Sequence, residues 1–402
     1  MQMRVLVVDD LDSNRDLLMR RLQRLGHEAD AAATGAEALL KLSAARWDLV
    51  LLDITMPDMD GYDTLRHIKA DPALADTPVV MVSAIDETES VVRCLKLGAD
   101  DYLAKPFEPA ILQARVESAL ARKRLADQRR IVLETLQREM DIGQQIQQGF
   151  LPMAMPAVPG WDVAGACLPA RQVSGDFYDA FELPSGRLAL VVADVCNKGV
   201  GAALYMALFR TLIRAMACHA PAGEAAPQTL LRTLAFTNDY IASVHGHENM
   251  FASVFFAILD ASSGHLDYLN AGHEPPLIKR RTGGAPQWLL PTGGAVGLFP
   301  GLRGSVASAA LEPGDCLFGY TDGLTEAPGD GGAFGEAALV RAIDASGPPA
   351  GALLATVQAR LAEHVCGADA HDDVTMLCVI RGTGRLAGHP APGSPTSPAR
   401  TP

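Results

Sequence analysis

The run Leu49-Val-Leu-Leu52, followed at once by Asp53, decides the fold of the first part of the chain. Its uninterrupted apolar residues are typical of a strand that is buried on both faces of a parallel sheet. Further strands are expected at Val5–Val8, Val79–Val82 and Tyr102–Ala104. Helices are expected between them at Ser13–Leu25, Glu37–Ala44 and Glu87–Leu97. This alternation predicts a doubly wound α/β domain with a parallel sheet.

Acidic residues follow two of these strands directly. Asp9 and Asp10 come after the first strand, and Asp53 comes after the central one. Ligands of an open parallel sheet gather at the carboxyl ends of its strands, so the three carboxylates should converge on one edge. Carboxylates packed together repel one another unless a cation shares the site, and oxygen ligands alone suit Mg²⁺.

A hydroxyl and an ammonium group belong to the same edge, because Ser83 and Lys105 also follow strands. A carboxylate beside Mg²⁺, a hydroxyl and an ammonium can attack a phosphoryl group and hold it as an acyl phosphate, with Asp53 as the nucleophile. Taken singly, Asp10 and Ser83 could be helix caps and Lys105 part of a turn. Their joint occurrence at strand ends favours the phosphoacceptor site.

Four motifs carry a resemblance to a known family. They are Val7-Val-Asp-Asp10, Leu52-Asp-Ile-Thr-Met-Pro-Asp-Met-Asp-Gly61, Val82-Ser-Ala84 and Gly98-Ala-Asp-Asp-Tyr-Leu-Ala-Lys-Pro-Phe107. Across the first block the chain resembles the receiver domain of bacterial two-component response regulators. The resemblance implies phosphorylation of Asp53 by a sensor histidine kinase or phosphotransfer protein. It also implies that Mg²⁺ is held by Asp10, Asp53 and the Thr55 carbonyl with help from Asp9, and that Ser83 and Tyr102 act as the switch.

A helical segment should follow the receiver. From Pro109 to Gln148 the sequence is charged and free of interior proline. Its apolar residues fall near helical spacing but not on a clean heptad, namely Leu125, Val132, Leu133, Leu136, Met140 and Ile146. We expect a coiled-coil-like linker helix that pairs with a second copy of the chain, the alternative being a single solvated spacer. The predicted division is a receiver at 1–120, a linker at 121–152, a third domain at 153–381 and a disordered tail at 382–402.

The short alternating strands and helices of residues 153–381 predict an α+β domain with an antiparallel β-sandwich. Asp176 precedes the strand Phe177–Leu183 and Asp194 ends the strand Leu188–Ala193, so a hairpin should set the two carboxylates face to face. By the same reasoning, Asp322 at the end of one strand should meet Asp372-Asp373 at the start of another. We expect these acids to meet at one sheet edge. Each also has a plain alternative as a turn or loop residue.

Such a cluster, without His or Cys, suits two Mg²⁺ or Mn²⁺ ions rather than zinc. Two metals bridged by water provide a hydroxide-like nucleophile and a clamp for a phosphoryl group. The sequence motifs around these acids carry a resemblance to a known family. They are Gln144-Gln-Ile-Gln-Gln-Gly-Phe-Leu-Pro152, Val173-Ser-Gly-Asp-Phe-Tyr-Asp179, Val192–Leu204, Leu269-Asn-Ala-Gly-His273, Gly319-Tyr-Thr-Asp-Gly-Leu-Thr-Glu326 and Asp372-Asp-Val-Thr375.

In this order the motifs resemble the stage II sporulation protein E and sigma-factor-regulator branch of the metal-dependent protein phosphatase 2C superfamily. The resemblance implies that the metals are held by Asp176, Asp194, the Val195 backbone, Asp322 and Asp372, with Asp373 and Asp179 as secondary candidates. It implies hydrolysis of phosphoserine or phosphothreonine on an anti-sigma-factor antagonist. The chain departs from the usual Ser-Gly at Cys196-Asn197. For His273 we favour a structural place in its turn over a general-acid role, and for Lys198-Gly199 helix capping and phosphate attraction are equal alternatives.

Composition excludes several other classes. A formal charge of −13 argues against nucleic-acid binding, which depends on clustered Lys and Arg. Seven cysteines without a C-x-x-C pair suit a reducing cytoplasm, and neither a signal peptide nor a membrane span of about 20 apolar residues is expected.

The sequence thus predicts a response regulator in which phosphorylation of Asp53 controls a metal-dependent protein phosphatase. One alternative is a receiver-controlled nucleotide cyclase, since Ser174-Gly-Asp-Phe177 faintly resembles the Gly-Gly-Asp/Glu-Glu-Phe hairpin but lacks its second acid. The other is an adaptor that has kept the phosphatase fold without catalysis.

Overall fold

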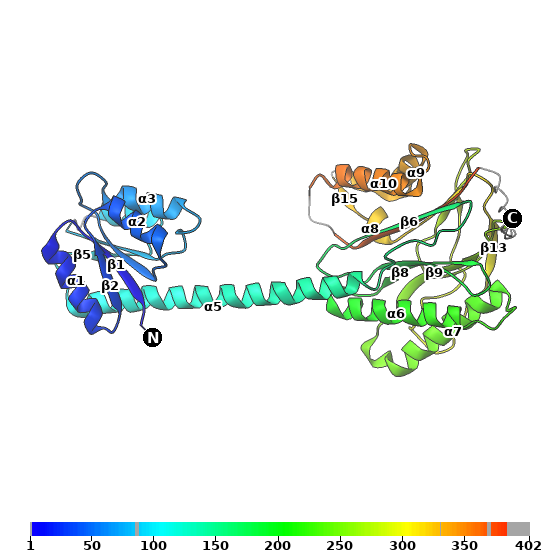
Figure 1. Cartoon of the computed structure of the whole chain (residues 1–402), viewed down its shortest axis with the longest axis horizontal. Helices are drawn as coiled ribbons and strands as arrows, with labels where there is room; N and C mark the ends of the chain where they lie inside the picture. Colours follow the sequence, from blue (N-terminus) through cyan, green and yellow to red (C-terminus); the bar gives the residue numbers. More distant parts are fainter. Residues whose placement is uncertain (1, 85–87, 330, 368–370, 384–402) are drawn as a thin grey trace, which may run out of the picture. The chain divides into compact units, whose positions relative to one another are not determined.

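The structure, a computed structural model, describes residues 2–84, 88–329, 331–367 and 371–383. The chain divides into two compact units, Met1–Gln137 and Arg138–Pro402, which are described separately (Figure 1). The predicted tail at 382–402 lies outside the described residues except for Gly382 and Thr383, as does Glu87 at the start of one predicted helix.

The first unit is a doubly wound α/β domain, as predicted. Its parallel sheet has the order β2-β1-β3-β4-β5. The strands are β1 (Arg4–Val8), β2 (Glu28–Ala32), β3 (Leu49–Asp53), β4 (Val79–Ser83) and β5 (Asp101–Ala104), and the helices are α1 (Asp12–Arg24), α2 (Gly35–Ala44), α3 (Gly61–Ala70), α4 (Thr88–Lys96) and α5 (Pro109–Gln148).

Alternate residues of each central strand fill two hydrophobic cores. Val50 and Leu52 of β3 pack with α2 and α3 on one face, while Leu49 and Leu51 pack with α1 and α5 on the other. This two-sided burial explains why the strand is apolar at every position. Strand β2 was not predicted, because it is a half-exposed edge strand with the sequence Glu-Ala-Asp-Ala-Ala.

Helix α5 is continuous over 40 residues. It begins at Pro109, inside the predicted receiver, and passes through residues 120 and 121 without a break. The boundary between the two units, after Gln137, also falls within it. The receiver's last helix and the predicted linker are therefore one element.

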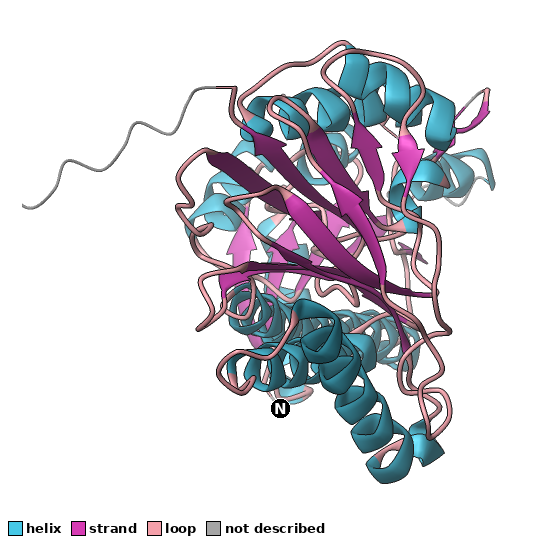
Figure 2. Cartoon of the chain, turned by 90° about the vertical axis from the view of Figure 1, so that its right-hand side faces the viewer, coloured by secondary structure: helices cyan, strands magenta, loops and turns pink. Residues whose placement is uncertain are grey.

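The second unit is a β-sandwich of two antiparallel sheets flanked by helices (Figures 1 and 2). One sheet has the order β13-β10-β9-β8-β7 and the other β12-β11-β14-β17-β6. The strands are β6 (Trp161–Leu168), β7 (Phe177–Glu182), β8 (Leu188–Val195), β9 (Ala252–Leu259), β10 (His265–Ala271), β11 (Leu277–Lys279), β12 (Gln287–Trp288), β13 (Ala307–Ala310), β14 (Cys316–Tyr320) and β17 (Val374–Arg381), with a separate β15 (Pro328–Gly329) and β16 (Gly332–Ala333) ribbon.

Three hydrophobic layers hold this unit together. One lies between the sheets and contains Val192, Phe255 and Val379. One outer layer joins a sheet to the helices α6 (Val200–Cys218) and α7 (Ala226–Val244). The other outer layer joins the second sheet to α8 (Asp322–Thr325), α9 (Gly335–Asp344) and α10 (Ala350–Val365). A short 3-10 helix spans Gly246–Glu248.

Helix α6 is long and apolar enough by composition to cross a membrane. In the fold it is a core helix, because Met206, Phe209 and Ile213 are buried against the sheet. Burial of one face in a β-sandwich accounts for its composition.

Candidate functional sites

The three acids predicted for the receiver lie together at the carboxyl ends of β1 and β3. One ligand oxygen from each of Asp9, Asp10 and Asp53 lies within 4.8 Å of the others. Lys105 Nζ is 2.7 Å from Asp9 Oδ2 and 3.2 Å from Asp53 Oδ2. The ammonium predicted from the end of β5 therefore contacts two of the three carboxylates.

Asp53 is buried and has a perturbed acidity. Burial raises its pKa and the charge of Asp9 adds to this, while Lys105 opposes the rise. Gly61 allows the chain to turn closely past it, since a Cβ there would lie 2.1 Å from the Asp53 carbonyl oxygen. Hard carboxylate oxygens that repel one another in a half-enclosed site are a donor set that fits Mg²⁺.

The predicted switch residues occupy neighbouring strands. Ser83 is fully buried at the end of β4, and Tyr102 is half-buried on β5. The backbone of Lys105 donates to the Ser83 carbonyl oxygen at 2.6 Å, which ties the ends of these strands together. Thr55, the predicted carbonyl ligand, is exposed in the loop after β3.

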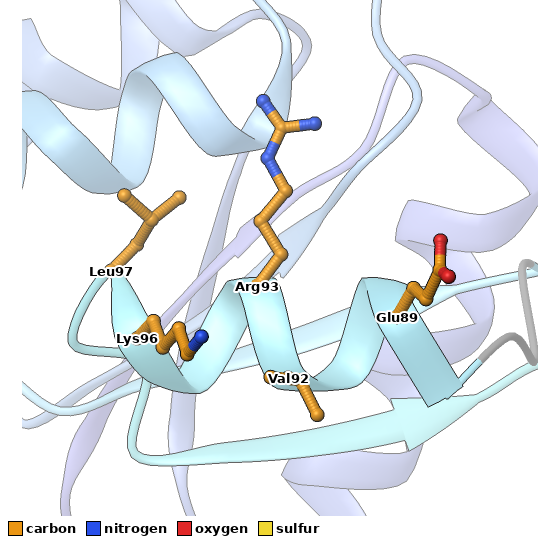
Figure 3. A pocket seen from close by; sticks show the side chains of 5 residues that line it. All are labelled: Glu89, Val92, Arg93, Lys96 and Leu97. Carbon is orange, nitrogen blue, oxygen red and sulfur yellow. The ribbon is translucent and has the colours of Figure 1, made fainter.

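A shallow hollow lies on α4, apart from the acidic site. Glu89, Val92, Arg93, Lys96 and Leu97 line it (Figure 3). The guanidinium carbon of Arg93 sits 4.1 Å from the ring centroid of Tyr62 on α3. No predicted site residue takes part in this hollow.

In the second unit the β7–β8 hairpin brings Asp176 to Asp194. Phe177 pairs with Ala193, so Asp176, the residue before β7, lies beside Asp194 near the end of β8. Asp176 is buried, and burial followed by the charge of Asp194 raises its pKa well above the ordinary range. Burial raises the pKa of Asp194 to about 7, with Asp322 as the next cause.

The second acidic pair comes from β14 and β17. Thr321 follows β14 and its backbone donates to the Thr375 carbonyl oxygen at 3.0 Å, which aligns the strand ends. A Cβ at Gly323 would lie 2.0 Å from the Asp373 carbonyl oxygen, so glycine permits this close approach. Burial raises the pKa of Asp322, and Asp372 is the next cause.

The expectation that these acids share one sheet edge is wrong. β7 and β8 belong to one sheet, and β14 and β17 belong to the other. The acids approach because the strand ends of the two sheets meet across the sandwich. A bond between the sheets marks this junction, where Thr321 Oγ1 donates to Asp176 Oδ2 at 2.6 Å.

The two secondary candidates have other partners. Asp373 accepts hydrogen bonds from the backbone of Ala170 at 2.8 Å and of Gly175 at 2.9 Å, one on each oxygen. Asp179 is buried and pairs with Arg210 at 3.0 Å and Arg214 at 2.9 Å. Asp373 thus supports the segment before Asp176, and Asp179 belongs to a salt-bridge network.

The acids of the second unit do not meet the spacing that the receiver acids show. Within the described residues, the receiver acids alone form a group of three whose ligand atoms all lie within 4.8 Å. Burial raises the pKa of Asp176, Asp194 and Asp322, and the negative charge of a neighbouring aspartate raises each of these pKa values further. Buried carboxylates in this state fit divalent cations, whose charge would offset the repulsion.

The segment after Asp194 lies at this site. The carbonyl oxygen of Val195, the predicted backbone ligand, would be 2.9 Å from a Cβ at Gly175. Asn197 has a φ of 70°, a left-handed conformation that asparagine tolerates better than most residues. Lys198 Nζ forms an ion pair with Asp372 at 2.8 Å.

His273 is a buried residue of its turn. Its backbone N–H donates to Asn270 Oδ1 at 2.8 Å, and its Nδ1 is 2.7 Å from Ser253 Oγ. Burial lowers the pKa of His273 to about 4, so the ring is neutral at pH 7. These contacts favour the structural place over the general-acid role.

Three residues near the acids were not singled out from the sequence. Thr321 bonds Asp176, and Glu274 contributes to an acidic surround because burial and the charge of Asp322 raise its pKa. Gln147 binds the backbone of Ser174. Thr321 and Gln147 lie within the motifs that carry the family resemblance, whereas Glu274 directly follows one.

Comparison with known proteins agrees with the division into two folded units. The family "Response regulator receiver domain" matches residues 5–117, and "Stage II sporulation protein E (SpoIIE)" matches residues 184–381. Protein IcfG of Synechocystis is 40% identical over 263 residues, which cover 60% of this chain and 41% of that protein. The chain therefore spans well under two thirds of this relative.

Two solved structures resemble the chain. The SiaA-PP2C domain of Pseudomonas aeruginosa has a TM-score of 0.53 at 22% identity, over 62% of this chain and 98% of that one. The RsbU and RsbW domains of a Mycobacterium tuberculosis protein have a TM-score of 0.46 at 33% identity, over 58% of this chain and 64% of that one. The chain joins a response regulator receiver domain to a SpoIIE domain that has the protein phosphatase 2C fold.

Proposed function

We propose that the chain is a metal-dependent phosphatase for phosphoserine or phosphothreonine in a protein, controlled by phosphorylation of Asp53. The observation that carries the proposal is the hydrogen bond from Thr321, the residue before Asp322, to the carboxylate of Asp176, which joins the acids of two sheets. Asp194, Asp322 and Asp372 lie within the residues that match the SpoIIE family, and Asp176 lies shortly before them. Their mutual repulsion supports a role in binding cations, because uncompensated buried charge is costly.

In this proposal Asp176, Asp194, Asp322, Asp372 and the Val195 carbonyl hold two Mg²⁺ or Mn²⁺ ions. The bound metals supply an activated water and neutralise the phosphoryl charge. Thr321 donates to the carboxylate of Asp176, and Asp373 accepts from the N–H of Gly175, the residue before it. Lys198, half-exposed beside Asp372, is placed to attract the phosphate of the substrate.

The substrate class follows from the same family. The resemblance of the motifs to the sigma-factor-regulator branch, with the SpoIIE match, supports a small phosphorylated anti-sigma-factor antagonist as the substrate. A protein surface of net charge −13 is a poor ligand for nucleic acid, which agrees with a protein target.

Control by the receiver requires a phosphate donor. The Asp9, Asp10 and Asp53 group with its contacting lysine supports Mg²⁺ binding and phosphoryl transfer from a sensor histidine kinase or phosphotransfer protein.

All seven cysteines are free thiols, which supports a cytoplasmic location.

Helix α5 supports a homodimer in this proposal. Leu125, Val132 and Leu136 are half-exposed or more, at spacings of seven and four residues. Such a stripe suits a coiled-coil seam with a second copy. Leu136→Glu should weaken the dimer, as measured by analytical ultracentrifugation, whereas Gln137→Glu on the same turn should not. A monomeric wild-type protein would refute this part.

The central experiment measures phosphate release from a phosphoserine antagonist protein. Hydrolysis should require Mn²⁺ or Mg²⁺ and should be lost in Asp194→Ala. Adding an acyl-phosphate donor should change the rate, and the direction of the change gives the sign of the control. Equal rates with and without donor would refute control by the receiver, and hydrolysis that persists in Asp194→Ala would refute the assigned site. A wild-type protein that binds its target without hydrolysis would be an adaptor.

A further inference from the structure

The C-terminal end of α5 holds the backbone beside Asp176 through a single side chain. Gln147 Nε2 donates to the Ser174 carbonyl oxygen at 2.6 Å, and the Ser174 N–H donates to Gln147 Oε1 at 2.9 Å. One amide group therefore satisfies both polar groups of one residue, as a neighbouring strand would. Both residues are buried, so water does not compete for these bonds.

Ser174 passes this contact on to Asp176. The Ser174 Oγ accepts a hydrogen bond from the Asp176 N–H at 3.0 Å. Only Gly175 separates the two residues, and its N–H donates to Asp373 Oδ2 at 2.9 Å. A displacement of Ser174 must therefore displace the Asp176 backbone or break these bonds.

Asp176 is thus positioned from three directions. Thr321 at the end of β14 binds its carboxylate, Asp373 before β17 binds the preceding N–H, and Gln147 on α5 binds the residue before that. The first two belong to the sandwich itself. Among these three contacts, Gln147 is the one that α5 provides.

The glutamines on either side of Gln147 differ from it in burial. Gln145 and Gln148, the neighbouring glutamines, are exposed, whereas Gln147 is 8% exposed. Near Gly143 the helix lies against Val173, whose Cγ1 would be 3.9 Å from a Cβ at that glycine. The polar connection between α5 and the segment before Asp176 is therefore concentrated in Gln147.

We propose that Gln147 is a positioning residue through which α5 sets the place of Asp176 and hence the affinity of the phosphatase domain for its divalent cations. The inference rests on the proposed function. Side chains that orient a metal ligand from behind commonly change metal affinity by roughly 10–100-fold when altered. Displacing Asp176 should weaken metal binding more than it slows turnover once metal is saturating.

The test compares Gln147→Met with Gln148→Met, which makes the same change at the exposed neighbour. Mn²⁺ affinity is measured by electron paramagnetic resonance on the full chain in an Asp53→Asn background, and Asp194→Asn identifies the signal of the phosphatase domain. Gln147→Met should weaken this binding by about tenfold or more and raise the Mn²⁺ concentration needed for half-maximal hydrolysis by a similar factor. Saturating Mn²⁺ should restore most of kcat, and Gln148→Met should match the unaltered background in each measurement.

A second variant guards against loss of folding. Gln147→Asn keeps the amide but is one methylene too short to reach both groups of Ser174, and it should also weaken Mn²⁺ binding while the metal-free protein still unfolds in one cooperative transition. Equal Mn²⁺ affinity in folded Gln147→Asn and Gln148→Met would overturn the inference and leave the proposed function intact. Failure of the proposed function would differ, because the wild-type protein would then neither bind Mn²⁺ through Asp194 nor release phosphate.

Discussion

The two acidic sites of this chain are built in opposite ways. The receiver site gathers Asp9, Asp10 and Asp53 at the end of one parallel sheet, and Lys105 contacts two of them. In the second unit the acids come from two sheets, and the ion pair of Lys198 with Asp372 is half-exposed. The receiver carries part of its own neutralising charge, whereas Asp176 and Asp194 are left to repel each other.

This contrast indicates different duties. A site with a resident lysine can accept and hold a phosphoryl group, because the lysine compensates charge while a bound cation comes and goes. A buried pair without such a partner depends on cations for its charge balance. Substitutions should therefore separate the two sites cleanly, and the following outcomes would break or sharpen the comparison.

The largest effect is expected for Asp194→Asn, which removes a buried carboxylate beside Asp176 and Asp322. Phosphate release should fall by about a thousandfold, the scale of losing a group that stabilises charge in the transition state. Phosphorylation of Asp53 should continue, as followed by labelling with an acyl-phosphate donor. Asp344→Asn is the matched control, since this carboxylate pairs with Lys279 outside the cluster. Retained hydrolysis would contradict the assignment.

Asp53→Asn should abolish labelling of the receiver. Without the carboxylate no acyl phosphate forms, so labelling should drop to background and the donor should no longer change the rate of phosphate release. Asp58→Asn serves as the control, because its left-handed φ of 66° suits asparagine as well as aspartate. Labelling that persists in Asp53→Asn would place the phosphoacceptor elsewhere.

Thr321→Val removes the bond between the sheets at Asp176 and leaves the Thr375 N–H without its acceptor. Mn²⁺ affinity of the second unit should weaken by about tenfold. The free energy of unfolding should fall by about 1–3 kcal/mol, the cost of an unsatisfied buried donor. Thr233→Val is the control, since within the described residues its Oγ1 has no hydrogen-bond partner. Calorimetry with and without Mn²⁺ measures both, and unchanged Mn²⁺ affinity would assign Thr321 to folding alone.

The smallest effect is expected for Lys198→Met. This lysine is 37% exposed, so its attraction for a phosphate is screened by water and should account for a roughly threefold rise in KM with little change in kcat. Lys279→Met is the control, because Lys279 pairs with Asp344. Steady-state kinetics on the phosphorylated antagonist decides it, and a fall in kcat with constant KM would show that Lys198 acts in the chemical step.

Much of the fold was predictable because it depends on local patterns. The buried strands β1, β3 and β4 are uniformly apolar, and the helices α6, α7 and α10 show helical periodicity with clear ends. Strand β2 escaped because an exposed edge strand lacks that pattern. The single helix α5 was divided in the prediction because nothing in its sequence marks where one unit stops contacting it.

Acids held by one sheet could be placed together from the sequence, whereas acids held by two sheets could not. Asp9, Asp10 and Asp53 follow strands of one parallel sheet, so chain direction alone places them together. Asp176 and Asp194 could also be placed together, because a hairpin sets the start of one strand beside the end of the other. Joining that hairpin to Asp322 required a second sheet, whose packing no local pattern encodes.

By itself the sequence determined which residues end each strand, and with them the identity and chemistry of the acids. Only the tertiary structure decided that the C-terminal acids meet between two sheets, that Asp373 faces backbone N–H groups, and that Gln147 holds Ser174. The physical reason is that strand direction and side-chain period are local properties of the chain. The pairing of a buried amide with a backbone 27 residues away depends on how packed layers come to rest against each other.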